Sequence, residues 1–177
     1  MPLAVFSRLP KALRAVVPAI VLVTALALAI GALCQRLTLN TTSSLPRGLY
    51  LLRPARSPAR GDIVAFAIPE SFRALVSEDG HLPLSYRLLK QLVAVPGDQV
   101  CVDDASFVVN WMLISRVAHE DSRGRLLPPA HLYCDTVPPG VGFVATEATT
   151  SLDSRFFGPV PLGQLTVAQP IWTQSSH

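Results

Sequence analysis

An uncharged apolar stretch from Val16 to Cys34 limits what this chain can fold into more than any other feature of the sequence. About 20 residues of this kind are enough to cross the hydrocarbon core of a bilayer as an α-helix. Pro18 lies in the first turn of the expected helix, where proline is tolerated. The chain has 177 residues, so the sequence predicts one membrane-spanning segment and one modest domain after it.

The charges beside the apolar stretch predict its orientation. Three positive residues precede the stretch and one follows it closely: Arg8, Lys11, Arg14 and Arg36. Positive residues are retained on the cytoplasmic side of a membrane. We therefore expect residues 1–15 in the cytoplasm, residues 16–34 as a transmembrane signal anchor in the inner membrane, and residues 35–177 as a periplasmic domain.

A cleaved signal peptide is the alternative interpretation of the stretch. Ala25-Leu26-Ala27 offers small residues of the kind that precede a cleavage site. The stretch is long for a signal peptide, and cleavage there would leave a strongly apolar new terminus. These two features favour a retained anchor.

The composition after the stretch is typical of a β-rich domain. Sixteen prolines and ten glycines in the chain argue against a helical bundle and favour short strands joined by turns. The formal charge of +3 includes the positive residues before the stretch, so the remainder is close to neutral. We therefore expect a mainly β domain without a basic surface for nucleic acid.

Several runs of apolar, β-favouring residues between turn signals are predicted to be strands. They are residues 49–52, 62–67, 86–95, 99–102, 106–109, 112–117, 142–146 and 165–169. Residues 35–43 are rich in threonine and serine and are predicted to be a short polar connector. Because this connector is short, the residues after it are expected close to the membrane surface.

A serine on a constrained loop and a lysine among apolar residues are the side chains most suited to chemistry. Ser44 precedes Leu-Pro-Arg-Gly, a turn sequence that can fix and expose a side chain. Serine becomes nucleophilic when a neighbouring base removes its proton, and a lysine can be that base. Lys90 is the only lysine after the apolar stretch, and burial among leucines would lower its pKa. An ordinary turn serine and a strand lysine are the alternatives.

The cysteines of the expected periplasmic domain predict a disulfide. Cys101 and Cys134 fall in that domain, and an oxidising compartment allows a disulfide to form and persist. Two buried free thiols are the alternative, because sequence does not show whether the two Cα atoms come within bonding range. Metal binding by His131 and Cys134 is weaker, since no second pair of ligands stands nearby. No metal or other cofactor is expected.

Three separated segments resemble the S26 signal peptidase family and, within it, the TraF-like peptidases of conjugative transfer. They are 42–50 (TSSLPRGLY), 88–100 (LLKQLVAVPGDQV) and 153–160 (DSRFFGPV), in the family's order. With Gly124-Arg125-Leu126-Leu127-Pro128 and the anchor, the resemblance covers almost the whole chain. It implies a signal-peptidase-type β domain behind one N-terminal transmembrane helix, a Ser/Lys dyad, and the removal of signal segments from exported proteins.

The resemblance also implies roles for residues of the first two segments. Ser44 would be the nucleophile and Lys90 the general base. Ser43 is the competing nucleophile. The pattern Ser-x-x-Pro of general signal peptidases would select Ser43, whereas the pattern Ser-x-Pro-x-Gly of the transfer-type peptidases would select Ser44. The sequence Gly-Leu-Tyr that follows favours Ser44. The hydroxyl of Thr42 and the backbone N–H of Ser44 would form the oxyanion hole, although Thr42 can equally be a plain loop residue.

In the third segment the resemblance implies supporting residues. Ser151 is expected to hydrogen-bond Lys90, and Asp153 with Arg155 is expected to form an ion pair that helps to hold the amine in place. A salt bridge unconnected with the dyad is the alternative. The sequence departs from the commonest family pattern at Gln91, where arginine often follows the lysine, and at Trp111, where glycine often follows an asparagine.

The function implied by the resemblance is acyl transfer on an exported pre-protein. A propilin of a conjugation apparatus is the favoured substrate, and conjugation or type IV secretion components are possible partners beside the lipid bilayer. The acyl-enzyme could be resolved by water or by an amine of the substrate, which would give a cyclic product. A general type I signal peptidase and a non-enzymatic, membrane-tethered component of a transfer apparatus are the alternatives.

Overall fold

The structure, a computed structural model, describes residues 11–54, 57–73, 86–121 and 123–174. The chain divides into two compact units, Met1–Leu37 and Thr38–His177. The first contains the helix α2 (Lys11–Cys34), which includes the window Val16–Cys34 with a mean hydropathy of 2.6. None of this window is buried within the protein. The predicted apolar helix is therefore present, and it is consistent with a single-pass membrane anchor.

The described part of the second unit is built mainly from strands. They are β1 (Leu37–Asn40), β2 (Gly48–Arg53), β3 (Ile63–Ala67), β4 (Arg87–Ala94), β5 (Gln99–Val102), β6 (Ser106–Val109), β7 (Met112–Arg116), β8 (Tyr133–Thr136), β9 (Val141–Ala145), β10 (Val160–Pro161) and β11 (Thr166–Thr173). The helical pieces are short: η1 (Glu70–Phe72), α4 (Ser154–Phe157) and η2 (Leu162–Gln164). The prediction of a mainly β domain is confirmed.

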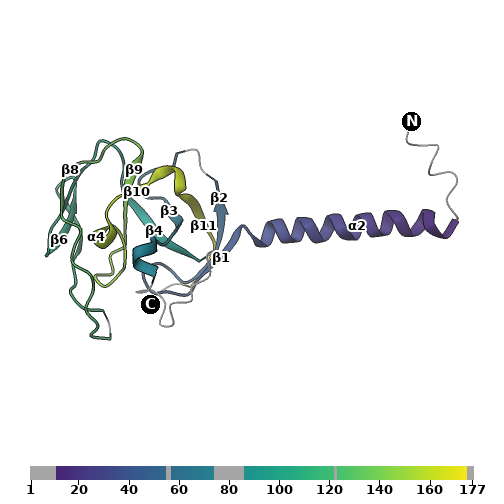
Figure 1. The fold of residues 1–177 in the computed structure, drawn as a ribbon, viewed down its shortest axis with the longest axis horizontal. Coiled ribbons are helices and arrows are strands. Elements are labelled where there is room, and N and C mark those ends of the chain that lie inside the picture. The colour runs from purple at the N-terminus through teal and green to yellow at the C-terminus, as the bar shows by residue number, and fades with distance from the viewer. Residues whose placement is uncertain (1–10, 55–56, 74–85, 122, 175–177) are drawn as a thin grey trace. The chain divides into compact units, whose positions relative to one another are not determined.

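Two sheets organise these strands (Figure 1). The larger sheet has the order β1-β2-β11-β3-β4-β9-β10, and the smaller one has the order β7-β6-β5-β8. Buried side chains of β5 and β6 pack against β4 and β9 to form one core between the sheets. Its members include Val93, Val100, Val102, Phe107, Val109, Phe143 and Ala145. This packing makes β4 and β9 the centre of the unit.

Every predicted strand is present, and the ends differ by at most one residue except in β11, which runs four residues further than expected. The prediction of residues 35–43 as a connector is wrong in part, because Leu37–Asn40 form β1 beside β2. Three strands, β1, β8 and β10, were not predicted. Strand β10 has two residues, too few for a pattern to show. Strands β1 (LTLN) and β8 (YCDT) have four residues, of which two are polar, whereas the predicted strands β5 and β6 of equal length have three apolar residues each.

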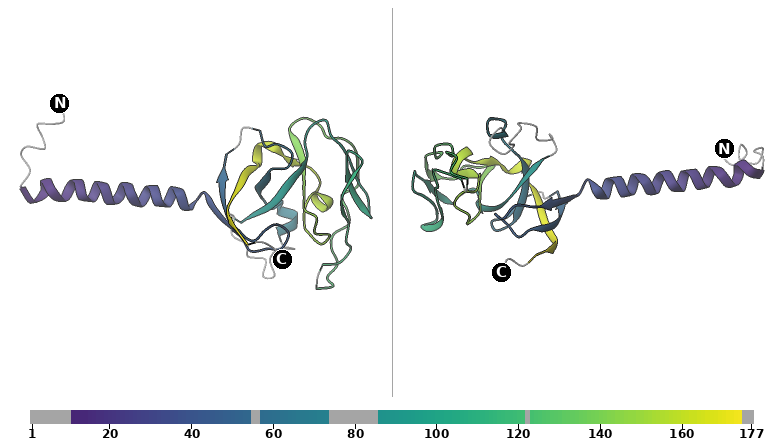
Figure 2. Two further views of the ribbon diagram at one scale, coloured as in Figure 1. Left: turned by 180° about the vertical axis from the view of Figure 1, so that it is seen from behind. Right: turned by 90° about the horizontal axis from the view of Figure 1, so that it is seen from below.

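The long strand β11 lies between β2 and β3 in the larger sheet, next to the predicted nucleophile loop. It pairs antiparallel with β2 and, at its start, with β3, and Figure 2 shows the yellow strand lying along the blue one. Gly48 at the start of β2 is required by this pairing, because a Cβ there would collide with the carbonyl oxygen of Trp172. The glycine of the Ser-Leu-Pro-Arg-Gly segment thus anchors one end of the loop.

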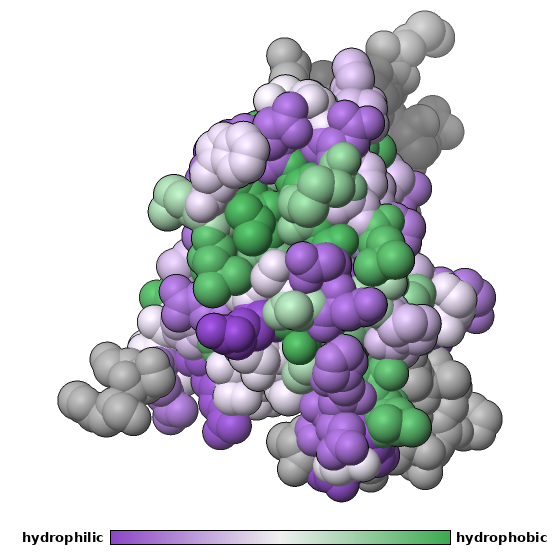
Figure 3. Space-filling view, turned by 90° about the vertical axis from the view of Figure 1, so that its left-hand side faces the viewer, coloured by the Kyte–Doolittle hydropathy of each residue, from purple (hydrophilic) through white to green (hydrophobic). Residues whose placement is uncertain are grey.

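The outer face of the smaller sheet carries an apolar row. The strand register places Leu113, Val108, Cys101 and Cys134 side by side across β7, β6, β5 and β8. Figure 3 shows a hydrophobic patch bordered by polar groups on the face that carries this sheet. Cys101 and Cys134 are joined here in a disulfide, with their Cα atoms 4.0 Å apart. The bond ties the edge strand β8 to β5.

Candidate active site

Strand β4 carries Lys90 into the interior of the larger sheet. Leu88 and Leu89, which point to opposite faces of the strand, belong to two different buried clusters. Both faces of β4 are therefore covered, and the Lys90 side chain is only 5% exposed. An amine in this position has lost most of its hydration, which is the condition that the sequence analysis required of a lysine base.

The predicted catalytic side chains converge on this amine. Lys90 Nζ donates hydrogen bonds to Ser44 Oγ at 3.3 Å and to Ser151 Oγ at 2.6 Å. Thr42 Oγ1 lies 3.2 Å from Ser44 Oγ. Four residues from three separated segments of the sequence are thus brought into one chain of polar contacts.

The pKa of Lys90 is lowered to about 8. Desolvation by burial is the largest cause, the Asp153 carboxylate acts in the opposite direction, and the Arg155 guanidinium lowers the pKa further. With this pKa, roughly a tenth of the amines are neutral at pH 7, compared with a negligible fraction for an exposed lysine. The lysine can therefore accept a proton near neutral pH.

Asn40, at the end of β1, organises the loop that carries Ser44. Its amide nitrogen donates to the carbonyl oxygens of Leu45 at 3.0 Å and Pro46 at 3.1 Å. Its Oδ1 accepts hydrogen bonds from the backbone N–H of Thr42 at 3.2 Å and from its hydroxyl at 2.8 Å. The sequence analysis missed this residue because it lay in the supposed connector. A signal was available in the sequence, because Asn40 stands four residues before Ser44 and asparagine side chains in turns often hydrogen-bond nearby backbone groups.

Asp153 and Arg155 form a buried bidentate ion pair. The guanidinium donates to the two carboxylate oxygens at 2.6 and 2.8 Å, and neither side chain is exposed. The remaining donors of Arg155 bind mainly carbonyl oxygens: those of Arg116, Thr146, Ala148, Thr149 and Ser151, together with the hydroxyl of Ser115. The pair thus holds the loop that carries Ser151, the partner of Lys90. Ser115 was not considered in the sequence analysis.

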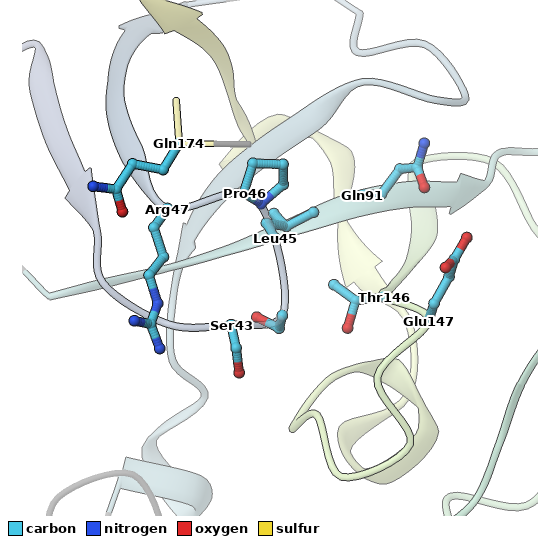
Figure 4. A pocket seen from close by; sticks show the side chains of 9 residues that line it. Ser43, Leu45, Pro46, Arg47, Gln91, Thr146, Glu147 and Gln174 are labelled. Atoms are coloured by element: carbon cyan, nitrogen blue, oxygen red, sulfur yellow. The ribbon is translucent and has the colours of Figure 1, made fainter. Parts of the chain in front are cut away.

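Two clefts meet at Ser44. One has a volume of about 530 Å³ and is lined by Ser44, Gln91, Thr146 and Glu147, among others. The other has a volume of about 310 Å³ and is lined by Ser44, Lys90 and residues 38–42, among others. Figure 4 shows that the first cleft lies between the loop around Leu45 and the wall formed by Thr146 and Glu147. An extended molecule bound across Ser44 would have a cleft on each side of this residue.

No metal centre is found in the part of the chain that the structure describes. No group of three or more histidine, cysteine, aspartate or glutamate side chains there is placed to hold an ion. His131 packs instead against Gly158, where a Cβ would collide with the imidazole ring. Cys134, its suggested co-ligand, is in the disulfide.

Comparison with known proteins yields one family and several relatives. A family model described as signal peptidase, peptidase S26, matches residues 9–172. A conjugal transfer protein TraF of Agrobacterium fabrum is 31% identical over 144 residues, which are 76% of this chain and 81% of the relative. A plasmid transfer protein TraF of Escherichia coli is 32% identical over 161 residues, which are 84% of this chain and 90% of the relative.

A solved structure of a signal peptidase I from Enterococcus faecalis is also similar. It aligns with 68% of this chain and 98% of its own, at 20% sequence identity and a TM-score of 0.34.

Proposed function

Since this chain belongs to the S26 family of signal peptidases, we propose that it is a membrane-bound serine endopeptidase with Ser44 as nucleophile and Lys90 as general base. The observation that carries the proposal is the buried amine of Lys90 between the hydroxyls of Ser44 and Ser151. Ser151 holds the amine from one side, so that it faces the nucleophile on the other. The buried Asp153–Arg155 pair would keep Ser151 in this position.

The proposed reaction begins with neutral Lys90. Its nitrogen takes the hydroxyl proton of Ser44 while Oγ bonds to a peptide carbonyl carbon, and the carbonyl π electrons move to its oxygen. When the carbonyl reforms, the C–N bond breaks and the lysine ammonium gives its proton to the leaving nitrogen. Water then attacks the ester, Lys90 takes a proton from it, and Ser44 Oγ leaves with that proton. An amine in place of water gives a new amide instead.

Thr42 and the backbone N–H of Ser44 remain the proposed oxyanion hole. The hydroxyl of Thr42 donates to Asn40 Oδ1 in the structure. Its hydrogen would have to turn away from Asn40 to reach the developing charge, whereas the backbone N–H is held by the loop itself. We therefore assign the larger share of oxyanion stabilisation to the backbone donor.

An unpaired strand edge supports a peptide as the substrate. Strand β3 pairs with β4 from Arg87 to Gln91, but β9 pairs with β4 only from Gln91 onward. The second edge of residues 87–90 is thus free of strand partners in the described chain, and the smaller cleft runs along it. An extended peptide could add to this edge by main-chain hydrogen bonds, with its carbonyl group next to Ser44.

The substrate we propose is an exported pre-protein, specifically a propilin of a conjugation apparatus. The similarity to conjugal and plasmid transfer proteins supports this choice. We further propose an inner-membrane anchor with residues 1–15 in the cytoplasm and residues 35–177 in the periplasm, because the positive residues precede the helix. Components of the transfer apparatus would be its partners. Maturation can end in a linear or a cyclic product.

Processing of a co-expressed candidate propilin in membranes tests the proposal. The wild type is expected to shorten the substrate, and intact mass separates a linear product from a cyclic one, which is lighter by one water. Lys90→Ala is expected to abolish processing, whereas Lys11→Ala, a matched change of the other lysine, should process normally. Equal processing by both lysine variants would exclude the proposed base.

The lowered pKa of Lys90 predicts how activity depends on pH. The neutral amine is the active form, so kcat/KM is expected to rise about tenfold per pH unit below the pKa and to level off near pH 8. The measurement is cleavage of the propilin by the purified full-length protein in detergent at pH values from 6 to 10. A rate that still increases tenfold per pH unit up to pH 10, as for an ordinary lysine with a pKa of 10.5, would show that Lys90 is hydrated in the working enzyme.

A further inference from the structure

One buried hydroxyl beside Ser44 and Lys90 has no hydrogen-bond partner among the residues that the structure describes. In the described part of the chain, Thr146 Oγ1 is the only buried side-chain nitrogen or oxygen atom for which no partner is found. The residue is 4% exposed. Leaving such a group unpaired disfavours the folded state, and buried hydroxyls are nearly always satisfied. The hydroxyl is therefore available to a hydrogen-bonding group from outside the described chain.

The main chain of Thr146 is held firmly in place. Its backbone N–H donates to Asp153 Oδ2 at 3.4 Å, and its carbonyl oxygen accepts from Arg155 Nη2 at 3.4 Å. It follows directly on β9, which pairs with β4 beside Lys90. The same buried ion pair that holds the Ser151 loop thus also fixes Thr146.

The side chain lies at the larger of the two clefts. Thr146 lines this cleft together with Ser44, Gln91 and Glu147. Figure 4 shows its side chain pointing into the space between the loop around Leu45 and Glu147. The hydroxyl can donate one hydrogen bond and accept others. A peptide main chain, with its alternating N–H and C=O groups, matches this capacity.

The two clefts divide a bound substrate at Ser44. If the acyl part pairs with the free edge of β4 in the smaller cleft, the chain beyond the attacked carbonyl must continue into the larger one, because Ser44 lies at both. The larger cleft would then hold the nitrogen side of the scissile bond. It would also hold an amine that attacks the acyl-enzyme, since that amine approaches from where the leaving group departs.

We propose that the larger cleft is the binding site for the amine side of the peptide and that Thr146 Oγ1 hydrogen-bonds its main chain there. The inference rests on the proposed function, because it requires an acyl-enzyme at Ser44. Thr146 is a positioning and specificity-determining residue in this proposal. It orients the leaving or entering nitrogen, while Lys90 exchanges the protons.

Partition of one acyl-enzyme between water and an amine isolates this role. The full-length protein in detergent is given the p-nitrophenyl ester of N-acetyl-trialanine, whose leaving group has no peptide main chain, together with trialanine amide as acceptor. The acceptor nitrogen attacks the Ser44 ester and passes a proton to Lys90, and Ser44 Oγ leaves with a proton from Lys90. Mass spectrometry then measures the ratio of acetyl-hexaalanine amide to the hydrolysed acid.

Thr146→Val keeps the shape and removes the hydroxyl. Its transfer-to-hydrolysis ratio is expected to be about tenfold below that of the wild type, as for the loss of one hydrogen bond to substrate. Thr146→Ser should restore the ratio to near the wild-type value. Thr150→Val, the same change at an exposed position four residues on, is the matched control. Since Thr146→Val removes an unpaired buried hydroxyl, its Tm should equal or exceed that of the wild type.

The outcomes separate the inference from the proposed function. Wild-type protein without Ser44-dependent nitrophenol release would overturn both. Normal release with the same ratio in Thr146→Val and wild type would overturn the role of Thr146 alone. Wild-type release with no transfer to the amine would overturn the whole inference and leave the proposed function standing. A lower Tm for Thr146→Val would show that the hydroxyl serves the fold.

Discussion

Ser44→Ala is expected to reduce processing of the propilin by a factor on the order of 10⁴ or more. The Oγ atom that would bond to the substrate is the one that accepts a hydrogen bond from Lys90 Nζ at 3.3 Å. Without this atom no acyl-enzyme can form, so the base and the oxyanion donors have no reaction to assist. Processing is measured as the rate of appearance of the mature mass in membranes that contain equal amounts of each variant.

Ser43→Ala is the matched control for the nucleophile. Ser43 lines the larger cleft, but the hydrogen bonds of Lys90 go to Ser44 and Ser151. We expect this variant to process the propilin at a rate of the same order as the wild type. If Ser43→Ala is inactive and Ser44→Ala is not, the nucleophile has been assigned to the wrong serine.

Arg155→Ala is expected to destabilise the domain by about 3–5 kcal/mol, because breaking a buried ion pair leaves a charge without its partner. For a domain of this size the loss corresponds to a fall in Tm of roughly 10–20 °C. The Asp153 carboxylate would lose two hydrogen bonds at 2.6 and 2.8 Å, and several carbonyl oxygens would lose a donor. Thermal unfolding of the full-length protein in detergent, followed by circular dichroism, measures the change.

Arg125→Ala separates the effect of burial from the loss of an arginine. Arg125 also pairs with an aspartate, Asp121, at 2.7 Å, but its side chain is 56% exposed. Exposed ion pairs contribute little to stability, so the Tm of this variant should stay close to that of the wild type. Equal and small changes in Tm for the two arginine variants would mean that Arg155 is hydrated rather than buried.

The double variant Asp153→Leu with Arg155→Met tests the role of the pair in the site. Removing both charges together avoids an unpaired buried charge, so part of the stability lost in Arg155→Ala should return. Processing should not return, because the loop of Ser151 loses the guanidinium that binds its carbonyl oxygens. Recovery of both stability and processing would make the pair a structural salt bridge, the alternative left open by the sequence.

Much of the candidate site could be predicted because its residues carry local signals. Ser44 precedes a turn sequence, and Lys90 is the only lysine after the helix, within a strongly apolar run. The structure brings these two together with Ser151 and Thr42, which were predicted from the family resemblance rather than from local signals. Ser115 could not be found in this way, because its importance comes from its contact with the distant Arg155. Asn40 has local partners, but its segment was interpreted as a connector and its role was not predicted.

The sequence by itself determined the long apolar N-terminal helix, which is consistent with a membrane anchor, and the position of most strands. These properties depend on mean hydropathy and on the alternation of apolar and polar residues, both of which can be read from residues that are neighbours in the sequence. Only the tertiary structure decided that, within the described residues, β9 does not pair with residues 87–90, that Arg155 holds the Ser151 loop, and that the hydroxyl of Thr146 is buried with no partner there. The physical reason is that burial, pairing and desolvation arise from contacts between segments far apart in the chain.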